Sequence, residues 1–209
     1  MAALNVKPTR MELSNLKKKR KVAVRGHKLM KDKRDEMVRR FIVYVRRNRT
    51  LREKVEQKLA SAMQGFVLAR ASMRAEAVEE ALCYPARPAE IKVSAQHVLS
   101  VVVPKLELAS VGKVELPYGI VGTSAELDAA VQAFAELLPL LIELAEVEKT
   151  CNRLADEIEK TRRRVNALEY VMIPQFDEAI RTIKMKLDEN ERGNLTRLMK
   201  TKEMLAQKE

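Results

Sequence analysis

Residues that usually carry enzyme chemistry are scarce and scattered in this sequence of 209 residues. His27 and His97 are the two histidines, and Cys83 and Cys151 are the two cysteines. No spacing among these four suits a metal site or a nucleophile with an adjacent base. The six glycines form no phosphate-binding or dinucleotide-binding fingerprint. We therefore predict no catalytic, cofactor-binding or metal-binding residues, reduced structural thiols, and a protein that is not an enzyme.

Basic runs are the other residues that could do chemistry, by attracting negative charge. They lie at residues 17–21 and 162–164, and residues 1–60 hold 20 Lys and Arg against 6 Asp and Glu. Aromatic side chains that could stack on bases do not alternate with these runs, which disfavours nucleic acid. An acidic surface on a partner protein suits them equally well. The simpler interpretation is a solvated helix face, and the alternative function is a basic coiled-coil nucleic-acid binder or a chaperone-like protein.

The elements that must position these charges are long helices. The sequence has no Trp, 4% aromatic residues and 33% charged residues, which favours a thin apolar seam over a compact core. A capping box at Thr9 and Glu12 predicts the start of a first helix. Apolar residues then follow a 3-4 spacing that is typical of a coiled coil. The seam positions predicted in this helix are Leu13, Leu16, Met37, Phe41 and Leu51. Arg20, His27, Arg34 and Asn48 fall on the same seam, where polar residues would fix register and partner.

The middle of the chain has a different composition, with β-branched residues bounded by prolines and glycines. We predict a short β-hairpin that turns near residues 94–96 and includes a strand from Val98 to Val103. A second capping box at Thr123 and Glu126 predicts the start of another long helix, with kinks at Pro139 and Pro174. Its predicted seam includes Leu168, Ile183 and Leu187.

These elements predict an all-α-dominated fold, a long antiparallel two-helix coiled coil with a short β-hairpin in its middle segment. We divide the one elongated domain into an N-terminal helix at 1–84, a middle segment at 85–122 and a C-terminal helix at 123–209. Matched helix lengths predict that residue numbers across the pair add up to about 215, which would place Phe41 near Pro174. No apolar run approaches the roughly 20 residues of a membrane span, and the N-terminus lacks the apolar region of a signal peptide. We expect a soluble, cytoplasmic protein.

Three stretches resemble the family of D subunits of V-type (A/V-type) ATPases, which also act as ATP synthases. They are residues 5–13 (NVKPTRMEL) leading to 25–36 (RGHKLMKDKRDE), residues 159–169 (EKTRRRVNALE) followed by Ile173-Pro174, and residues 182–192 (TIKMKLDENER). The resemblance covers essentially the whole chain and is weakest at 85–122. One departure is Gly193, which follows Arg192 where family members often have Glu.

The resemblance implies a non-catalytic central-stalk rotor subunit that transmits torque between an ATP-hydrolysing hexamer and a membrane ring that translocates ions. The implied partners are the catalytic A and regulatory B subunits, the small F subunit of the stalk, and a funnel-like subunit on the membrane ring. It implies no direct contact with nucleotide, and a location peripheral to the membrane.

Two sets of contact residues follow as hypotheses. The expected hexamer contacts are Lys17, Lys18, Lys21, Lys28, Lys31 and Lys33. The expected contacts to the small F subunit are Val98, Val101, Val103, Arg162 and Arg163, within a surface that also includes residues 46–70 and 130–165.

Overall fold

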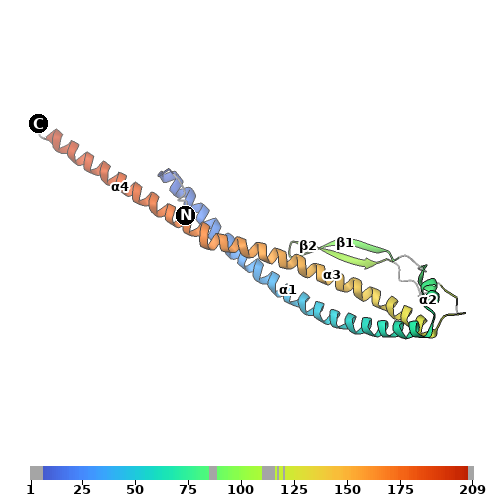
Figure 1. Ribbon diagram of the computed structural model, residues 1–209. Helices are drawn as coiled ribbons and strands as arrows, with labels where there is room; N and C mark the ends of the chain where they lie inside the picture. The colour runs from blue at the N-terminus through green and yellow to red at the C-terminus, as the bar shows by residue number, and fades with distance from the viewer. Residues whose placement is uncertain (1–6, 85–88, 110–115, 117, 120, 207–209) are drawn as a thin grey trace. The chain divides into compact units, whose positions relative to one another are not determined.

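Seven elements follow one another in the computed structural model, which describes residues 7–84, 89–109, 116, 118–119 and 121–206 (Figure 1). Their order is α1 (Arg10–Ser72), α2 (Ala75–Leu82), β1 (Ile91–Val98), β2 (Val101–Leu108), α3 (Ala125–Ala167), the π-helix η1 (Leu168–Met172) and α4 (Ile173–Ala206). The predicted all-α class with a β-hairpin in the middle is confirmed. The chain forms two compact units: one combines the chain up to Glu36 with Ile158–Glu209, and the other is Met37–Glu157.

In the first unit, the beginning of α1 runs antiparallel to the end of α3, to η1 and to α4. Three cross-helix pairs define this direction: Arg10 with Glu191, Arg20 with Asp177, and His27 with Glu169. The buried seam between the helices includes Leu16, Thr161, Val165 and Ile183. Of the predicted seam residues in this unit, Leu16 and Ile183 are buried, and Leu13, Leu168 and Leu187 are half-buried.

In the second unit, the remainder of α1 runs antiparallel to α3. Leu51, Val147 and Cys151 form a buried cluster against which Phe41 and Tyr44 pack. Met37, which we predicted on the seam, is fully buried. Nearer the chain reversal, a second cluster contains Ala69, Ala81 and Leu127.

The predicted pairing sum of about 215 is wrong. The cross-helix pairs in both units have residue numbers that add up to between 190 and 201. Phe41 therefore packs beside Val147 and Cys151 and not beside Pro174. The cause is the end of α1, which lies at Ser72, well before the prolines that follow Tyr84.

The reversal after α1 is made by local hydrogen bonding and by an amphipathic second helix. The Ser72 hydroxyl donates to the carbonyl of Ala69, and Arg74 takes an extended conformation before α2. Helix α2 buries Val78 and Ala81, and the latter packs on the last turn of α1. An unbroken helix to residue 84 would leave this apolar face in water, so tertiary packing ends α1 early.

Side-chain caps begin the two long helices. The backbone N–H of Glu12 donates to the Thr9 hydroxyl at 3.2 Å, as predicted. At the second helix the cap is Ser124, which accepts from the N–H of Leu127 at 3.3 Å, while the predicted cap Thr123 donates its hydroxyl to Gly119. The neighbouring hydroxyl therefore makes the capping bond that we assigned to Thr123.

The β-hairpin turns at Leu99 and Ser100, not at the predicted residues 94–96, which lie inside β1. Both turn residues have positive φ values, 49° and 69°, as a two-residue hairpin turn of type I′ requires. Val98 pairs with Val101, and both are buried along with Val103. Strand β2 is tied to α3 by the N–H of Leu106, which donates to the Glu146 carboxylate at 2.9 Å. Burial of three valines on one face selects this register over the one we predicted.

A single π-helical turn corrects the phase of the second long helix. The seam positions Thr161 and Leu168 are seven residues apart, Leu168 and Phe176 are eight apart, and Phe176 and Ile183 are again seven apart. One extra residue in a heptad repeat would rotate every later seam position away from α1. The wider turn of η1 absorbs that residue, with the N–H of Ile173 donating to the carbonyl of Leu168. Pro174, which has no N–H to donate, follows directly.

We therefore expect the chain to tolerate loss of one residue inside η1 better than loss of one residue elsewhere. Deletion of the exposed Tyr170 together with Pro174→Ala should give a continuous heptad and leave the thermal unfolding temperature within a few degrees. Deletion of the exposed Glu178 should turn Ile183 off the seam and cost about 2–3 kcal/mol. Thermal unfolding by circular dichroism compares the two deletions. Equal destabilisation by both would show that η1 has no phase-correcting role.

Candidate functional site

The charged and apolar surfaces of the two units are the candidate functional sites of this chain. Within the part of the chain that the structure describes, no three His, Cys, Asp or Glu side chains lie close enough together to hold a metal ion. None of the described helices has a stretch apolar enough to span a membrane.

The basic surface of the first unit lies on α1. Residues 10–36 carry 11 Lys and Arg against 4 Asp and Glu. Five of the six predicted hexamer contacts (Lys17, Lys18, Lys21, Lys28 and Lys31) are exposed, and Lys33 is half-buried. None of the six forms an ion pair with another described residue. Their charge is therefore available to a partner.

Polar residues that interrupt the seam are each paired within the chain. Arg20 contacts Asp177, His27 Nε2 lies 3.2 Å from the Glu169 carboxylate, and Arg34 contacts the adjacent Asp35. In the second unit, the side chain of Asn48 interacts with the thiol of Cys151 and lowers its pKa, against the larger effect of burial. The Arg20–Asp177, His27–Glu169 and Asn48–Cys151 pairs cross between helices. They therefore fix the register, as the sequence pattern indicated.

The predicted contacts to the small F subunit do not gather in one place. Val98, Val101 and Val103 are buried inside the second unit. Arg162 and Arg163 are exposed on the first unit, where Arg163 pairs with Glu159 one turn away. A partner of the hairpin would meet its opposite face, where Ile91, Val93 and Val102 are 49%, 70% and 51% exposed.

Sequence reasoning included residues 46–70 in the surface for the small F subunit but did not single out the exposed apolar stripe that α1 carries there in the second unit. Leu59, Met63 and Val67 recur every four residues, and Leu68 lies beside them. These four side chains are 37–64% exposed, and the last three line a shallow hollow with Gln64. Residues 59–69 contain no charged residue, a signal that was visible in the sequence. Exposed apolar stripes of this kind mark protein contacts.

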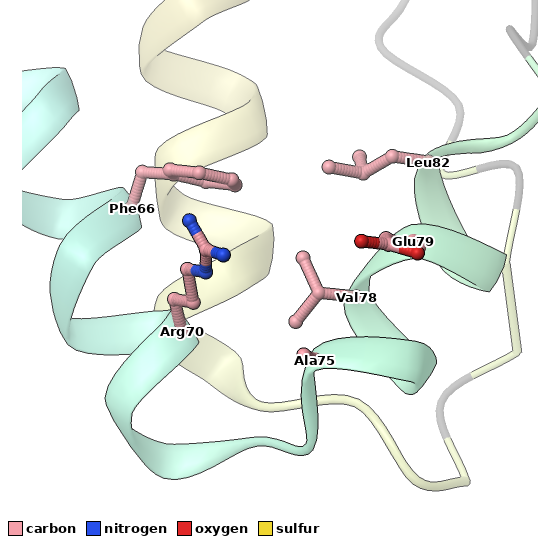
Figure 2. A pocket seen from close by; sticks show the side chains of 6 residues that line it. All are labelled: Phe66, Arg70, Ala75, Val78, Glu79 and Leu82. Carbon is pink, nitrogen blue, oxygen red and sulfur yellow. The ribbon is translucent and has the colours of Figure 1, made fainter.

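A cavity of about 350 Å³ lies between the end of α1 and α2 (Figure 2). Phe66 and Arg70 project into it from α1, and Val78, Glu79 and Leu82 face them from α2. The Arg70 guanidinium lies below the Phe66 ring, so one wall is both apolar and positive while the other carries a carboxylate. This lining can accept a partner side chain but holds no nucleophile with a base.

Comparison with known proteins decides the family. The family model that describes the D subunit of ATP synthase matches residues 12–203. The chain belongs to the family of V-type ATP synthase D subunits. It is 54% identical to the V-type ATP synthase D subunit of Thermoanaerobacter sp. (strain X514) over 98% of this chain and 99% of that protein. The protein of the same name from Acetivibrio thermocellus is 54% identical over 98% and 94% of the two chains, and that from Clostridium novyi is 53% identical over 98% and 97%.

Membership of the D-subunit family confirms the resemblance carried by the motifs. All three quoted stretches lie within the matched residues 12–203, apart from the first seven residues of the first stretch. Membership also connects this chain to ATP-driven and ATP-forming ion transport, the activity of the complexes for which the family is named.

The two thiols of this D-subunit chain should differ strongly in reactivity. Cys83 is exposed, whereas Cys151 is buried beside Leu51 and Val147, and burial raises the pKa of its thiol. Because the thiolate is the reactive form, we expect a maleimide at neutral pH to modify Cys83 at least about 100-fold faster than Cys151. Mass spectrometry of Cys83→Ser and Cys151→Ala variants separates the two rates. Similar rates in the folded protein would contradict the buried seam at Cys151, and denaturant should abolish the difference.

Proposed function

We propose that this chain is the central rotor shaft of a V-type ATP synthase, a non-catalytic subunit that transmits torque between the ATP-hydrolysing hexamer and the membrane ring. The observation that carries the proposal is the pairing of antiparallel helices in both units by a buried seam with polar cross-links. Such pairs resist sliding and twisting without a thick core, as a torque-bearing element within a narrow opening requires. Family membership supplies the complex in which that element would act.

The first unit is the part that we assign to the hexamer of A and B subunits. Its unpaired lysines would face acidic loops of the hexamer. Exposed ion pairs are each worth only about 0–1 kcal/mol, so contacts of this kind can be exchanged as the shaft turns. Long-range attraction would still draw the shaft into place.

The second unit is the part that we assign to the lower stalk. The uncharged stripe of Leu59, Met63, Val67 and Leu68 offers a permanent contact to the small F subunit, and the outward face of the hairpin belongs to the same unit. The cavity between α1 and α2 would accept a side chain of the funnel-like subunit. Contact with the membrane would be indirect, which places the chain at the cytoplasmic periphery.

Charge reversal tests the assignment of the first unit. Lys17→Glu, Lys21→Glu and Lys28→Glu together should weaken binding to the purified A/B hexamer at least about tenfold at low salt and lower coupled ATP hydrolysis. A matched variant, Lys54→Glu, Lys58→Glu and Lys149→Glu, changes the net charge equally at exposed sites of the second unit. Titration by biolayer interferometry gives both affinities. Equal losses of affinity in the two triple variants would show that only net charge matters, and would contradict the assignment.

Substitution on the stripe tests the site for the small F subunit. Met63→Glu with Val67→Glu should weaken binding of that subunit at least about tenfold, because two carboxylates would be buried against apolar surface. Asn166→Glu with Asn194→Glu adds the same charge at exposed positions of the first unit and should change the affinity less than about threefold. Isothermal titration calorimetry with the purified F subunit measures both. Unchanged affinity in the first pair would exclude the stripe.

A further inference from the structure

An apolar groove of about 570 Å³ crosses the first unit where α1 passes η1. Val22, Ala23 and Gly26 line it from α1, and Leu168, Met172 and Phe176 line it from η1 and α4. Val22 is 68% exposed and Met172 is 42% exposed, although both lie next to the seam. The π-helical turn is what places Leu168 and Met172 at this level, so the groove is built by the phase correction itself.

Gly26 keeps the groove open, and nothing in the chain requires a glycine there. It lies inside α1 with no positive φ, and a Cβ added to it would meet no atom within 4 Å. Glycine is nevertheless among the poorest residues for a helix interior. An occupant from outside the chain would explain a residue that the fold itself disfavours.

The rim of the groove indicates the chemistry of that occupant. Lys18 and Lys19 border it, and Lys17 and Lys21 lie on the adjoining turns. None of these four lysines forms an ion pair with another residue that the structure describes. An apolar side chain flanked by carboxylates would fill the groove and pair with its rim.

We propose that the groove receives an apolar side chain carried by an acidic loop on the inner surface of the A/B hexamer. The proposal rests on the proposed function and names the segment of the shaft that the hexamer holds. A single apolar side chain buries little surface, so this contact costs little to break and can form again as successive loops meet the groove. The lysines at the rim select acidic loops over other surfaces.

Filling the groove with a side chain tests the proposal. Gly26→Leu adds a side chain to the lining of the groove, where an added Cβ meets no atom within 4 Å, and Gly193→Leu makes the same change on α4, where an added Cβ also meets nothing within 4 Å. Gly193 lies outside the groove lining, and both substitutions favour the helix. Full-length wild-type and variant chains are compared for affinity to the purified A/B hexamer, after circular dichroism confirms equal helicity. We expect Gly26→Leu to weaken binding at least about tenfold and Gly193→Leu less than about twofold.

The remaining outcomes separate this proposal from the one on which it rests. If the wild type binds the hexamer and Gly26→Leu binds it equally well, the groove has no role there while the shaft assignment stands. If the wild type does not bind the hexamer, both proposals fall. Sedimentation of the wild-type chain alone tests another occupant: self-association that Gly26→Leu abolishes would assign the groove to a second copy and overturn the proposal.

Discussion

The helices of this chain can bury their apolar seams only against each other, and this constraint governs the rest of the structure. With no Trp and few aromatic residues, the protein has too few large side chains to build a separate core. Its fully buried side chains, such as Met37, Leu154 and Val165, lie along the paired helices. The two departures from simple pairing both protect the seam: α2 covers the end of α1, and η1 returns α4 to phase.

An apolar seam alone would leave the two helices free to pair in several registers, because one heptad resembles the next. The polar seam residues restrict that freedom. Arg20, His27 and Asn48 each find a partner on the facing helix in the observed register. A slip by one heptad would break all three of these pairs at once, which the observed register avoids. Arg20, Asp177 and Glu169 are each about half exposed, so their ion pairs contribute little attraction, and their value lies in distinguishing one register from the next.

The heptad spacing of apolar residues could be predicted from the sequence, but features set by packing between elements could not. The seam of α1 from Leu13 to Leu51 follows from 3-4 spacing alone. The end of α1 does not, because Pro85 sets only the last position at which a helix could stop, while the packing of Ala81 on Ala69 sets the true end. The hairpin turn at Leu99-Ser100 carries no Gly or Asn to mark it. The valines predicted to contact a partner are buried instead, on a hairpin that is tied to α3 by the hydrogen bond from Leu106 to Glu146. The eight-residue spacing between Leu168 and Phe176 is visible in the sequence, but it is recognised only when the heptad positions of the neighbouring residues are already assigned.

The two units expose different chemistry, and the difference matches two kinds of contact. Along α1 in the first unit, exposed apolar residues such as Val22 and Leu29 alternate with lysines, so any partner must meet charge and apolar surface together. In the second unit, residues 59–69 expose apolar side chains with no charge among them. Charged surface can be hydrated again at little cost when a contact is released, whereas a continuous apolar stripe resists exposure to water. A protein that must exchange one set of neighbours while keeping another would need both surfaces on one chain, each confined to its own unit.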